Sequence, residues 1–157
     1  MAITRTYKFR LYPTHAQWKK LQNNLNVCRF VYNRFIEKIH SEGFQSRNDL
    51  SYVLTELKQQ ESWLYDYNSK MLQMIATQAH SAQKSIAVLN KNGHPTGKLK
   101  FAKYSEYLTF TYNQSGFRLE EDKLWLSKIG RLSIISHRNI PHDAQIKQVV
   151  ITRTKSG

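Results

Sequence analysis

Hydrophobic positions follow a helical period in the middle of the chain and a strand period from Leu108 onward. Between Asn68 and Asn90 the apolar residues recur every three or four positions, which is typical of one buried helix face. They are Leu72, Ile75, Ala79, Ala82, Ile86 and Leu89. The pattern predicts an amphipathic helix that ends before the loop "KNGHPTGK", whose Gly and Pro residues break helices.

Two further helices are predicted upstream. Thr14 stands at an N-cap position with Gln17 at the matching capping-box position, and Gly43 ends this first helix. Its buried stripe is expected to be Trp18, Leu21, Leu25, Cys28, Phe35 and Ile39. A shorter helix is expected to start at Asn48 or Asp49 and to bury Leu50, Val53, Leu54 and Leu57.

Strands are predicted at both ends of the chain. Residues Ile3–Leu11 alternate and carry Tyr and Phe. From Leu108 onward, "LTFTYN", "FRLEEDKLWLS", "RLSIIS" and "IKQVVITRT" are β-rich pieces separated by Gly116, the acidic turn at residues 120–122, Gly130 and Pro141. The order strand, helices, strands predicts an α+β fold, either a β-barrel or a small sheet interrupted by a helical insertion. Further core residues are expected to be Phe9, Leu11, Phe30, Val31, Trp63 and Trp125.

The polar face of the Asn68–Asn90 helix is unusual for a solvated surface. It carries no acid and only Lys70 and Lys84 as charges, where Glu and Lys pairs are normally found. Neutral hydrogen-bonding residues stand in their place: Ser69, Gln73, Thr77, Gln78, His80, Ser81 and Gln83. Such a surface calls for a functional explanation.

Net charge supplies the strongest compositional signal. The formal charge of +13 exceeds what solubility requires and favours a polyanionic partner, with nucleic acid ahead of a membrane surface. No acid occurs between Tyr67 and Ser105, an interval that holds Lys70, Lys84, Lys91, Lys98, Lys100 and Lys103. A phosphate backbone passing there would meet no repulsion, although a basic pI is also common among cytosolic proteins.

Chain length and cysteine content indicate the number of domains and the cellular compartment. The 157 residues suit one domain, or one domain with an insertion. The apolar runs are too short to cross a bilayer, and "MAITRTYKFR" lacks the apolar segment of a signal peptide. A single Cys28 fits a reducing cytosol and is expected to be a buried structural thiol. We therefore expect a cytoplasmic protein with no membrane contact.

Several kinds of chemical site are not supported. His137 and His142 have no cysteine beside them, so no zinc site is expected. "GHPTGKL" has too few residues between its glycines for a phosphate loop, and Leu99 stands where Ser or Thr should hold magnesium. The acids lie mostly at helix ends, exposed helix positions or one turn rather than in a cluster that could hold catalytic metal ions. We expect no cofactor and no catalysis from this chain alone.

Six ordered segments make the chain resemble the TnpB (OrfB-type) proteins of insertion sequences. They are "KFRLYPTHAQ", "CRFVYN", "SWLYDYNSKMLQ", "LTFTYN", "SKIGRLSIISHRNIP" and "VVITRTKSG", spanning Lys8 to Gly157. TnpB-like proteins are RNA-guided DNA endonucleases related to type V CRISPR effectors, acting in transposition and DNA recombination. The resemblance covers essentially the whole chain.

The resemblance implies a domain plan. The N-terminal part of such proteins is a wedge-type, oligonucleotide-binding-like β-barrel with a helical recognition bundle inserted after its first strand. Here residues 1–12 would be that strand, 13–95 the insertion and 96–157 the rest of the barrel. The family's RuvC-like nuclease domain, with its acidic triad and zinc-binding insert, has no counterpart in these residues. The chain would be a recognition module, with DNA and guide RNA as partners and, as one option, a separate chain carrying the nuclease.

The resemblance also implies candidate contacts with a short transposon-adjacent DNA motif. The readers fall on Ser69, Gln73, Thr77 and Thr111, with Tyr112 and Asn113 beside the last and Arg47 and Ser51 less securely aligned. A Gln side chain can both donate to and accept from one base edge, and hydroxyls can do either. Ser69 has a plainer alternative, because a Ser at a helix start can serve as a cap.

Guide RNA would be held through its shape and phosphates. The candidates are Lys8, Arg10, Lys98, Lys100, Lys103, Arg131, Arg138 and Arg153, with Tyr12 and Tyr104 available for stacking. The plainer alternative for many of them is an ordinary solvated charge.

Two other functions remain open at the level of sequence. A stand-alone helix-turn-helix regulator would use two or three short helices that carry basic residues, form a dimer and bind a palindrome. A metal-dependent nuclease or recombinase would cleave DNA when magnesium is supplied.

Overall fold

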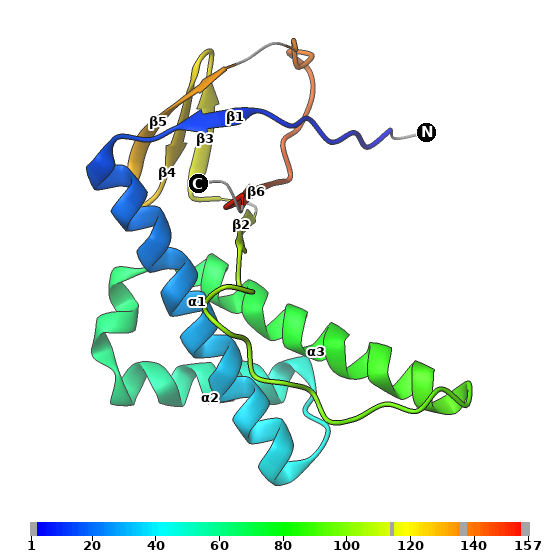
Figure 1. Cartoon of the computed structure of the whole chain (residues 1–157). Helices are drawn as coiled ribbons and strands as arrows, with labels where there is room; N and C mark the ends of the chain where they lie inside the picture. Colours follow the sequence, from blue (N-terminus) through cyan, green and yellow to red (C-terminus); the bar gives the residue numbers. More distant parts are fainter. Residues whose placement is uncertain (1–2, 114, 136–137, 155–157) are drawn as a thin grey trace.

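The computed structural model describes residues 3–113, 115–135 and 138–154 (Figure 1). Strand β1 (Arg10–Tyr12) is followed by α1 (His15–Glu42), α2 (Arg47–Gln60), the short 3-10 helix η1 (Ser62–Asp66) and α3 (Ser69–Lys91). Then come strands β2 (Thr109–Asn113), β3 (Phe117–Glu120), β4 (Lys123–Leu126), β5 (Gly130–Ile135) and β6 (Gln148–Thr152). The α+β class and the helical segment between the first and second strands are confirmed.

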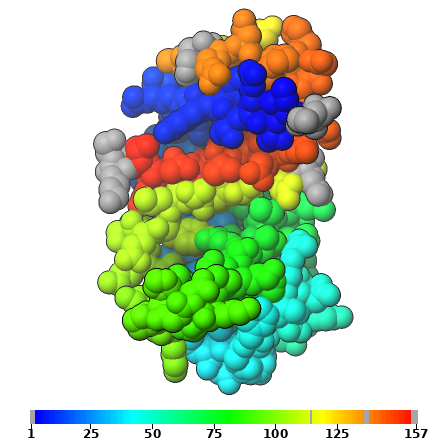
Figure 2. Space-filling model, turned by 90° about the vertical axis from the view of Figure 1, so that its right-hand side faces the viewer, coloured from blue at the N-terminus to red at the C-terminus, as the bar shows by residue number. Residues whose placement is uncertain are grey.

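The strands form two antiparallel sheets. One has the order β1-β5-β4-β3, and the other pairs β2 with β6. No strand pairing among the described residues joins the two into a closed barrel, so the barrel stays a prediction. In the space-filling view of Figure 2, β6 lies between the N-terminal residues and the segment that leads into β2.

The first predicted strand is shorter than expected. Only Arg10–Tyr12 pair with a neighbour, opposite Ser133–Ile135 of β5, although the alternating pattern begins at Ile3. An alternating pattern predicts an extended chain, but it does not show whether a partner strand lies alongside.

Helix boundaries follow their capping residues. Thr14 Oγ1 accepts from the Gln17 N–H at 3.2 Å and Gln17 Oε1 accepts from the Thr14 N–H at 3.0 Å, the predicted capping box. Gly43, with φ of 85°, ends α1 as predicted. The second helix starts earlier than Asn48, because Ser46 is its N-cap and Asp49 completes a second capping box.

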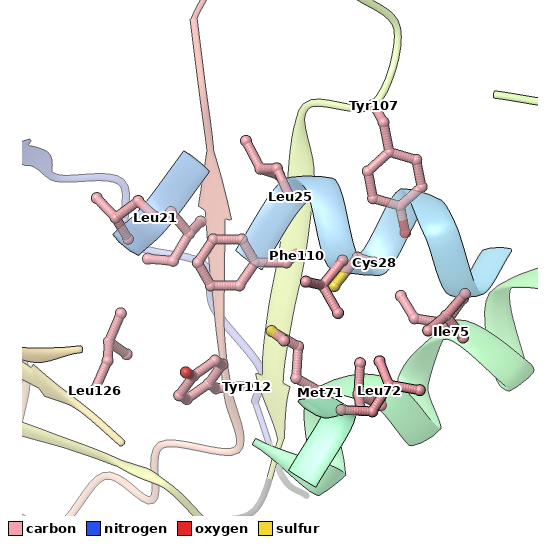
Figure 3. Packing of buried hydrophobic residues seen from close by; sticks show 14 of the residues in the cluster. Leu21, Leu25, Cys28, Met71, Leu72, Ile75, Tyr107, Phe110, Tyr112 and Leu126 are labelled. Carbon is pink, nitrogen blue, oxygen red and sulfur yellow. The ribbon is translucent and has the colours of Figure 1, made fainter. Parts of the chain in front are cut away.

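One hydrophobic core connects the helices to both sheets. Leu25, Cys28 and Leu72 from the helices meet Phe110 and Tyr112 from β2, with Leu126 of β4 nearby (Figure 3). Cys28 is fully buried as predicted, and this burial raises the pKa of its thiol. None of the helices in the described part of the chain is long and apolar enough to span a bilayer.

Several predicted core residues lie at the surface instead. Trp18 is 41% exposed in the first turn of α1, and Leu89 is 43% exposed near the end of α3, which projects beyond the bundle in Figure 1. Trp63 is 39% exposed; its ring packs on Phe30 while its Nε1–H donates to Glu61. The helical period identifies a face, but the length of the neighbouring elements decides how much of it is covered.

Candidate nucleic-acid interface

An exposed neutral stripe runs along the first half of α3. Ser69 and Gln73 are exposed and Thr77 is half-buried, and their four-residue spacing places them on one side of the helix. Asn68 caps the helix by accepting the Met71 N–H at 2.9 Å, so Ser69 is the first helical residue and not the cap. Leu72, Ile75 and Ala79 are buried on the opposite side, which fixes the rotation of the stripe toward solvent.

Strand β2 lies against this helix and brings a second predicted reader to it. A hollow of about 240 Å³ is lined by Thr77 and Thr111 together with Met74, Ile75, Gln78, Thr109 and Phe110. Asn113 is partly buried, and its Nδ2 contacts Met74 Sδ at 3.2 Å. Thr77 and Thr111 therefore share one concave surface, and Gln73 lies one turn closer to the N-terminus of α3.

Tyr112 is not available to DNA. Its side chain is fully buried, its hydroxyl donates to the Ser127 carbonyl at 2.6 Å, and Asn24 Nδ2 donates to it at 3.4 Å. Burial raises the pKa of Tyr112 to about 12. Strand alternation explains why Tyr112, predicted as a reader, is buried: it shares the inward face of β2 with Phe110, whereas Thr111 lies on the other face.

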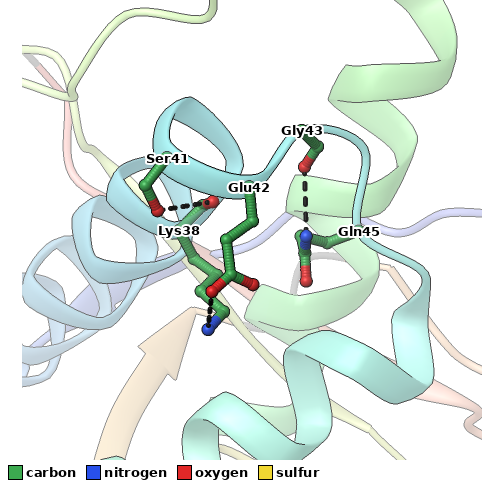
Figure 4. Close-up of polar contacts among 5 residues, drawn as sticks. All are labelled: Lys38, Ser41, Glu42, Gly43 and Gln45. Carbon is green, nitrogen blue, oxygen red and sulfur yellow. Dashed lines mark hydrogen bonds and ion pairs between the residues drawn. The ribbon is translucent and has the colours of Figure 1, made fainter.

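Gln83, predicted on the polar surface of α3, is buried instead. Its side-chain amide accepts from the Gln45 N–H at 2.8 Å and donates to the Gln45 carbonyl at 3.0 Å. Gln45 in turn donates to the Gly43 carbonyl, in the turn between α1 and α2 (Figure 4). Gln83 thereby satisfies the backbone of a turn about forty residues away, a partner that no helical pattern reveals.

The less securely aligned candidates lie on α2. Arg47 is exposed at the first position of this helix, and Ser51 Oγ donates to the Arg47 carbonyl at 3.0 Å. Neither residue lines the hollow that Thr77 and Thr111 share.

The predicted RNA contacts fall into two groups, the first on the extended segment 97–107. Lys98, Lys100 and Lys103 are all exposed there. Asn33 of α1 holds the segment by donating to the Ala102 carbonyl at 3.1 Å and accepting the Ala102 N–H at 2.7 Å. His40 adds a hydrogen bond to the Leu99 carbonyl at 2.6 Å. The lysines thus project from a backbone fixed along α1.

The second group surrounds the four-stranded sheet. Lys8, Arg10 and Arg138 are exposed, and the two arginines lie over tyrosine rings, Arg10 over Tyr12 at 5.5 Å and Arg138 over Tyr7 at 4.8 Å. Arg131 is exposed and 3.7 Å from Glu120. Arg153 links the two groups, because it donates to Gln22 and lies over the ring of Tyr104 at 5.1 Å.

The sequence reasoning missed one pair in this group. Arg118 lies over the indole of Trp125 at 4.6 Å, and Trp125, expected in the core, is only half-buried. The alternation of "KLWL" contains the signal, since Leu124 and Leu126 are buried and Trp125 therefore faces the other side of the sheet.

Metal ligands do not gather anywhere in the part of the chain that the structure describes. No group of three or more His, Cys, Asp or Glu residues is placed to hold a metal ion there. His137, one of the two histidines considered as ligands, lies outside the described residues.

Comparison with known proteins supplies independent information. Residues 1–42 match the OrfB IS605-type helix-turn-helix domain. The structure places β1 and the single continuous helix α1 in that range, so a helix-turn-helix pair would have to include α2.

The chain is also 26% identical over 163 residues to a protein of Streptomyces pristinaespiralis named "Putative RNA-guided DNA endonuclease". The alignment covers 99% of this chain but spans only 40% of that relative. These matches confirm the resemblance to OrfB-type, TnpB-like proteins: the first 42 residues are similar to the OrfB-type helix-turn-helix domain, and almost the whole chain is distantly similar to the protein named "Putative RNA-guided DNA endonuclease".

Proposed function

We propose that the chain is the nucleic-acid recognition module of a TnpB-like RNA-guided DNA endonuclease. In this proposal residues 13–95 form the recognition insertion, and residues 1–12 and 96–157 form a wedge-type, oligonucleotide-binding-like barrel. DNA cleavage is assigned to a RuvC-like domain that is not part of these 157 residues. The partial coverage of the relative supports this division.

The observation that carries the proposal is the neutral stripe of α3 beside Thr111. Lysines that contact phosphates carry no sequence information, whereas amide and hydroxyl groups on base edges can discriminate bases. Gln73 is exposed, and Thr111 shares a hollow with Thr77. A short duplex motif lying along the stripe would meet Ser69, Gln73 and Thr77 from the helix and Thr111 from the strand.

Guide RNA is assigned to the two basic groups. Lys98, Lys100 and Lys103 project from a fixed extended segment, an arrangement suited to a phosphate backbone. Recognition of the guide through its shape and phosphates would leave sequence reading of the target to base pairing.

Selection from a duplex library with a randomised motif tests the proposal. Gln73→Ala should reduce preference for the selected motif about 5- to 150-fold, because one bidentate base contact contributes about 1–3 kcal/mol. Lys98→Ala should instead weaken all duplexes alike and lower the salt slope by about one. Gln59→Ala is the matched control, since it removes an exposed Gln from α2. Selection of the same motif, with unchanged preference, by the Gln73→Ala variant would refute the assignment of this stripe.

One observation favours a second candidate, a stand-alone helix-turn-helix regulator. α1 and α2 are joined by only the residues Gly43–Ser46, and the first turn of α2 presents Arg47 to solvent. Such regulators read a palindrome as dimers, with the start of the second helix on base edges. Sedimentation decides between the two: a monomer with a non-palindromic site excludes the regulator.

A further inference from the structure

Cationic and aromatic side chains line up across the outer face of the four-stranded sheet. Strand register places Arg118 opposite Trp125, and Trp125 opposite Arg131. The next row contains Glu120, Lys123, Ser133 and Tyr12, again directly paired across β3, β4, β5 and β1. Because alternate residues point to opposite faces, these two rows share one face, while Leu124 and Leu132 lie in the core on the other.

The contacts within these rows leave an excess of positive charge. Glu120 is the one carboxylate on this face among the described strand residues, and it lies 3.7 Å from Arg131, whose side chain remains 66% exposed. Lys123 donates to Ser133 Oγ at 2.7 Å, a neutral partner that does not offset a positive charge. Arg118 has no carboxylate partner in the described residues; its guanidinium carbon lies over the Trp125 ring, 4.6 Å from the ring centroid.

We propose that this outer face binds an unpaired segment of the guide RNA, with one base stacked on the Arg118–Trp125 pair. Arg131 and Lys123 contact the adjoining phosphates. The inference rests on the proposed function, and it names the part of the RNA and the residues that hold it. We refer to Arg118, Trp125, Arg131 and Lys123 as the stacking platform.

Charge and ring chemistry select this occupant. An unpaired base exposes both of its faces, so it can lie on an arginine plane and extend the existing guanidinium–indole stack by one layer. Bases inside a duplex are already stacked on their neighbours, so target duplex cannot use the platform without being unpaired. The positive charges of Arg131 and Lys123 would attract the phosphates of RNA and of DNA alike. We choose RNA because the proposed function includes a guide RNA.

Binding of single-stranded oligoadenylate of about twelve nucleotides to the purified chain tests the proposal, because adenine stacks well and strand-binding sites span about 4–16 nucleotides. Arg118→Ala should weaken binding about tenfold, the loss expected for one base stack. Arg118→Lys keeps the charge but not the plane, so it should weaken binding about threefold without changing the salt slope. Lys58→Ala, which removes one cation from α2 at the opposite end of the molecule in Figure 1, is the matched control and should change affinity less than twofold.

Fluorescence locates the bound base. The chain has three tryptophans, so the double variant Trp18→Phe and Trp63→Phe leaves Trp125 as the emitter. Saturating oligoadenylate should change its emission in this variant, and should not do so after Arg118→Ala at the same occupancy.

The outcomes separate the inference from the function on which it rests. Wild-type affinity in Arg118→Lys, an Arg118→Ala loss no larger than that of Lys58→Ala, or unchanged Trp125 emission at saturation overturns the platform and leaves the motif-reading proposal standing. Tighter binding of deoxyadenylate or of the adenylate–uridylate duplex overturns the assignment to unpaired RNA. A chain that binds neither RNA nor DNA overturns both proposals.

Discussion

The stripe on α3 and the outer face of the sheet differ in the chemistry that they present to solvent. Ser69, Gln73 and Thr77 offer uncharged donors and acceptors, whereas the sheet offers Arg118 stacked on Trp125 with further cations around it. Neutral groups distinguish bases by their edges, and planar cations on rings hold bases and phosphates of any sequence. In the proposed function, sequence reading and strand holding are therefore assigned to different kinds of secondary structure.

The two surfaces are joined at one tight contact. Gly116, between β2 and β3, lies so close to α3 that an added Cβ would be 2.6 Å from Asn68 Nδ2 and 3.5 Å from Tyr112. Asn68 is the N-cap of α3, immediately before Ser69. The start of α3 therefore packs against the turn between β2 and β3, and we expect a change at this contact, the Gly116–Asn68 joint, to affect the stripe on α3 more than the outer face of the sheet.

The largest effect is expected from Gly116→Ala. Its φ of 87° strains any other residue, and the methyl group must displace Asn68, which costs the helix its cap. We expect a loss of about 2–3 kcal/mol in the free energy of unfolding, from the sum of about 1–2 for strain and about 1 for the cap. Chemical denaturation measures it.

Gly93→Ala is the matched control for this substitution. Gly93 has a φ of 82° but nothing within 4 Å of the added Cβ, so it reports strain alone, about 1–2 kcal/mol. Below the unfolding temperature, Gly116→Ala should lose preference for the selected duplex motif and still bind oligoadenylate. Equal stability losses in the two variants would show that the joint does not hold α3.

A smaller effect is expected from Tyr112→Phe, which tests whether Tyr112 belongs to the core or to the reading surface. The change removes the hydroxyl that donates to the Ser127 carbonyl and accepts from Asn24. Unfolding free energy should fall by about 1–2 kcal/mol because two buried polar groups lose their partner. Motif preference should be unchanged; its loss without destabilisation would return Tyr112 to the reading surface. Tyr65→Phe, at a ring that is 61% exposed, should leave stability nearly unchanged.

The smallest effect concerns the pH dependence of α2, which contributes to neither the stripe nor the platform. The Ser46 backbone N–H, and then its hydroxyl, hold the pKa of Asp49 below its ordinary value of 3.8. A lowered folded-state pKa means that the stabilisation is present above pH 3.8 and is lost as pH falls through the folded-state value.

Asp49→Asn should therefore lower the unfolding temperature slightly near neutral pH, and the difference from wild type should shrink below about pH 4. Asp143→Asn, which removes an exposed carboxylate from a loop, is the control and should show no such convergence. A difference that stays constant with pH would show that the carboxylate charge of Asp49 contributes nothing to the capping box.

The sequence predicted most clearly where the signal is local. The Thr14–Gln17 capping box, the end of α1 at Gly43 and the hairpin turn after Glu120 all depend on residues within a few positions of each other. The strand–helices–strands order followed from a change of period that is also readable locally. Ser69 and Gln73, placed on the polar face by their spacing, are exposed for the same reason, whereas Thr77 is half-buried.

The expectations about burial and exposure failed where a residue distant in the sequence determines whether a side chain is covered. Gln83 belongs to a polar helix face by its spacing, yet the turn at Gln45 uses both ends of its amide. Trp18, Trp63 and Leu89 have core chemistry, but no neighbouring element covers them fully. Tyr112 and Trp125 exchanged their expected places, because the register of each strand decides which face meets the core.

By itself the sequence determined the three helices, both ends of the first, the alternation of the strands and the excess of cations, because these depend on neighbouring residues and on composition. Only the tertiary structure decided that Thr111 would meet Thr77, that Arg118 would lie on Trp125, and that Gly116 would press on the cap of α3. Those pairings join residues on separate elements, and their distances are set by packing a single core between helices and sheets rather than by any local conformational preference.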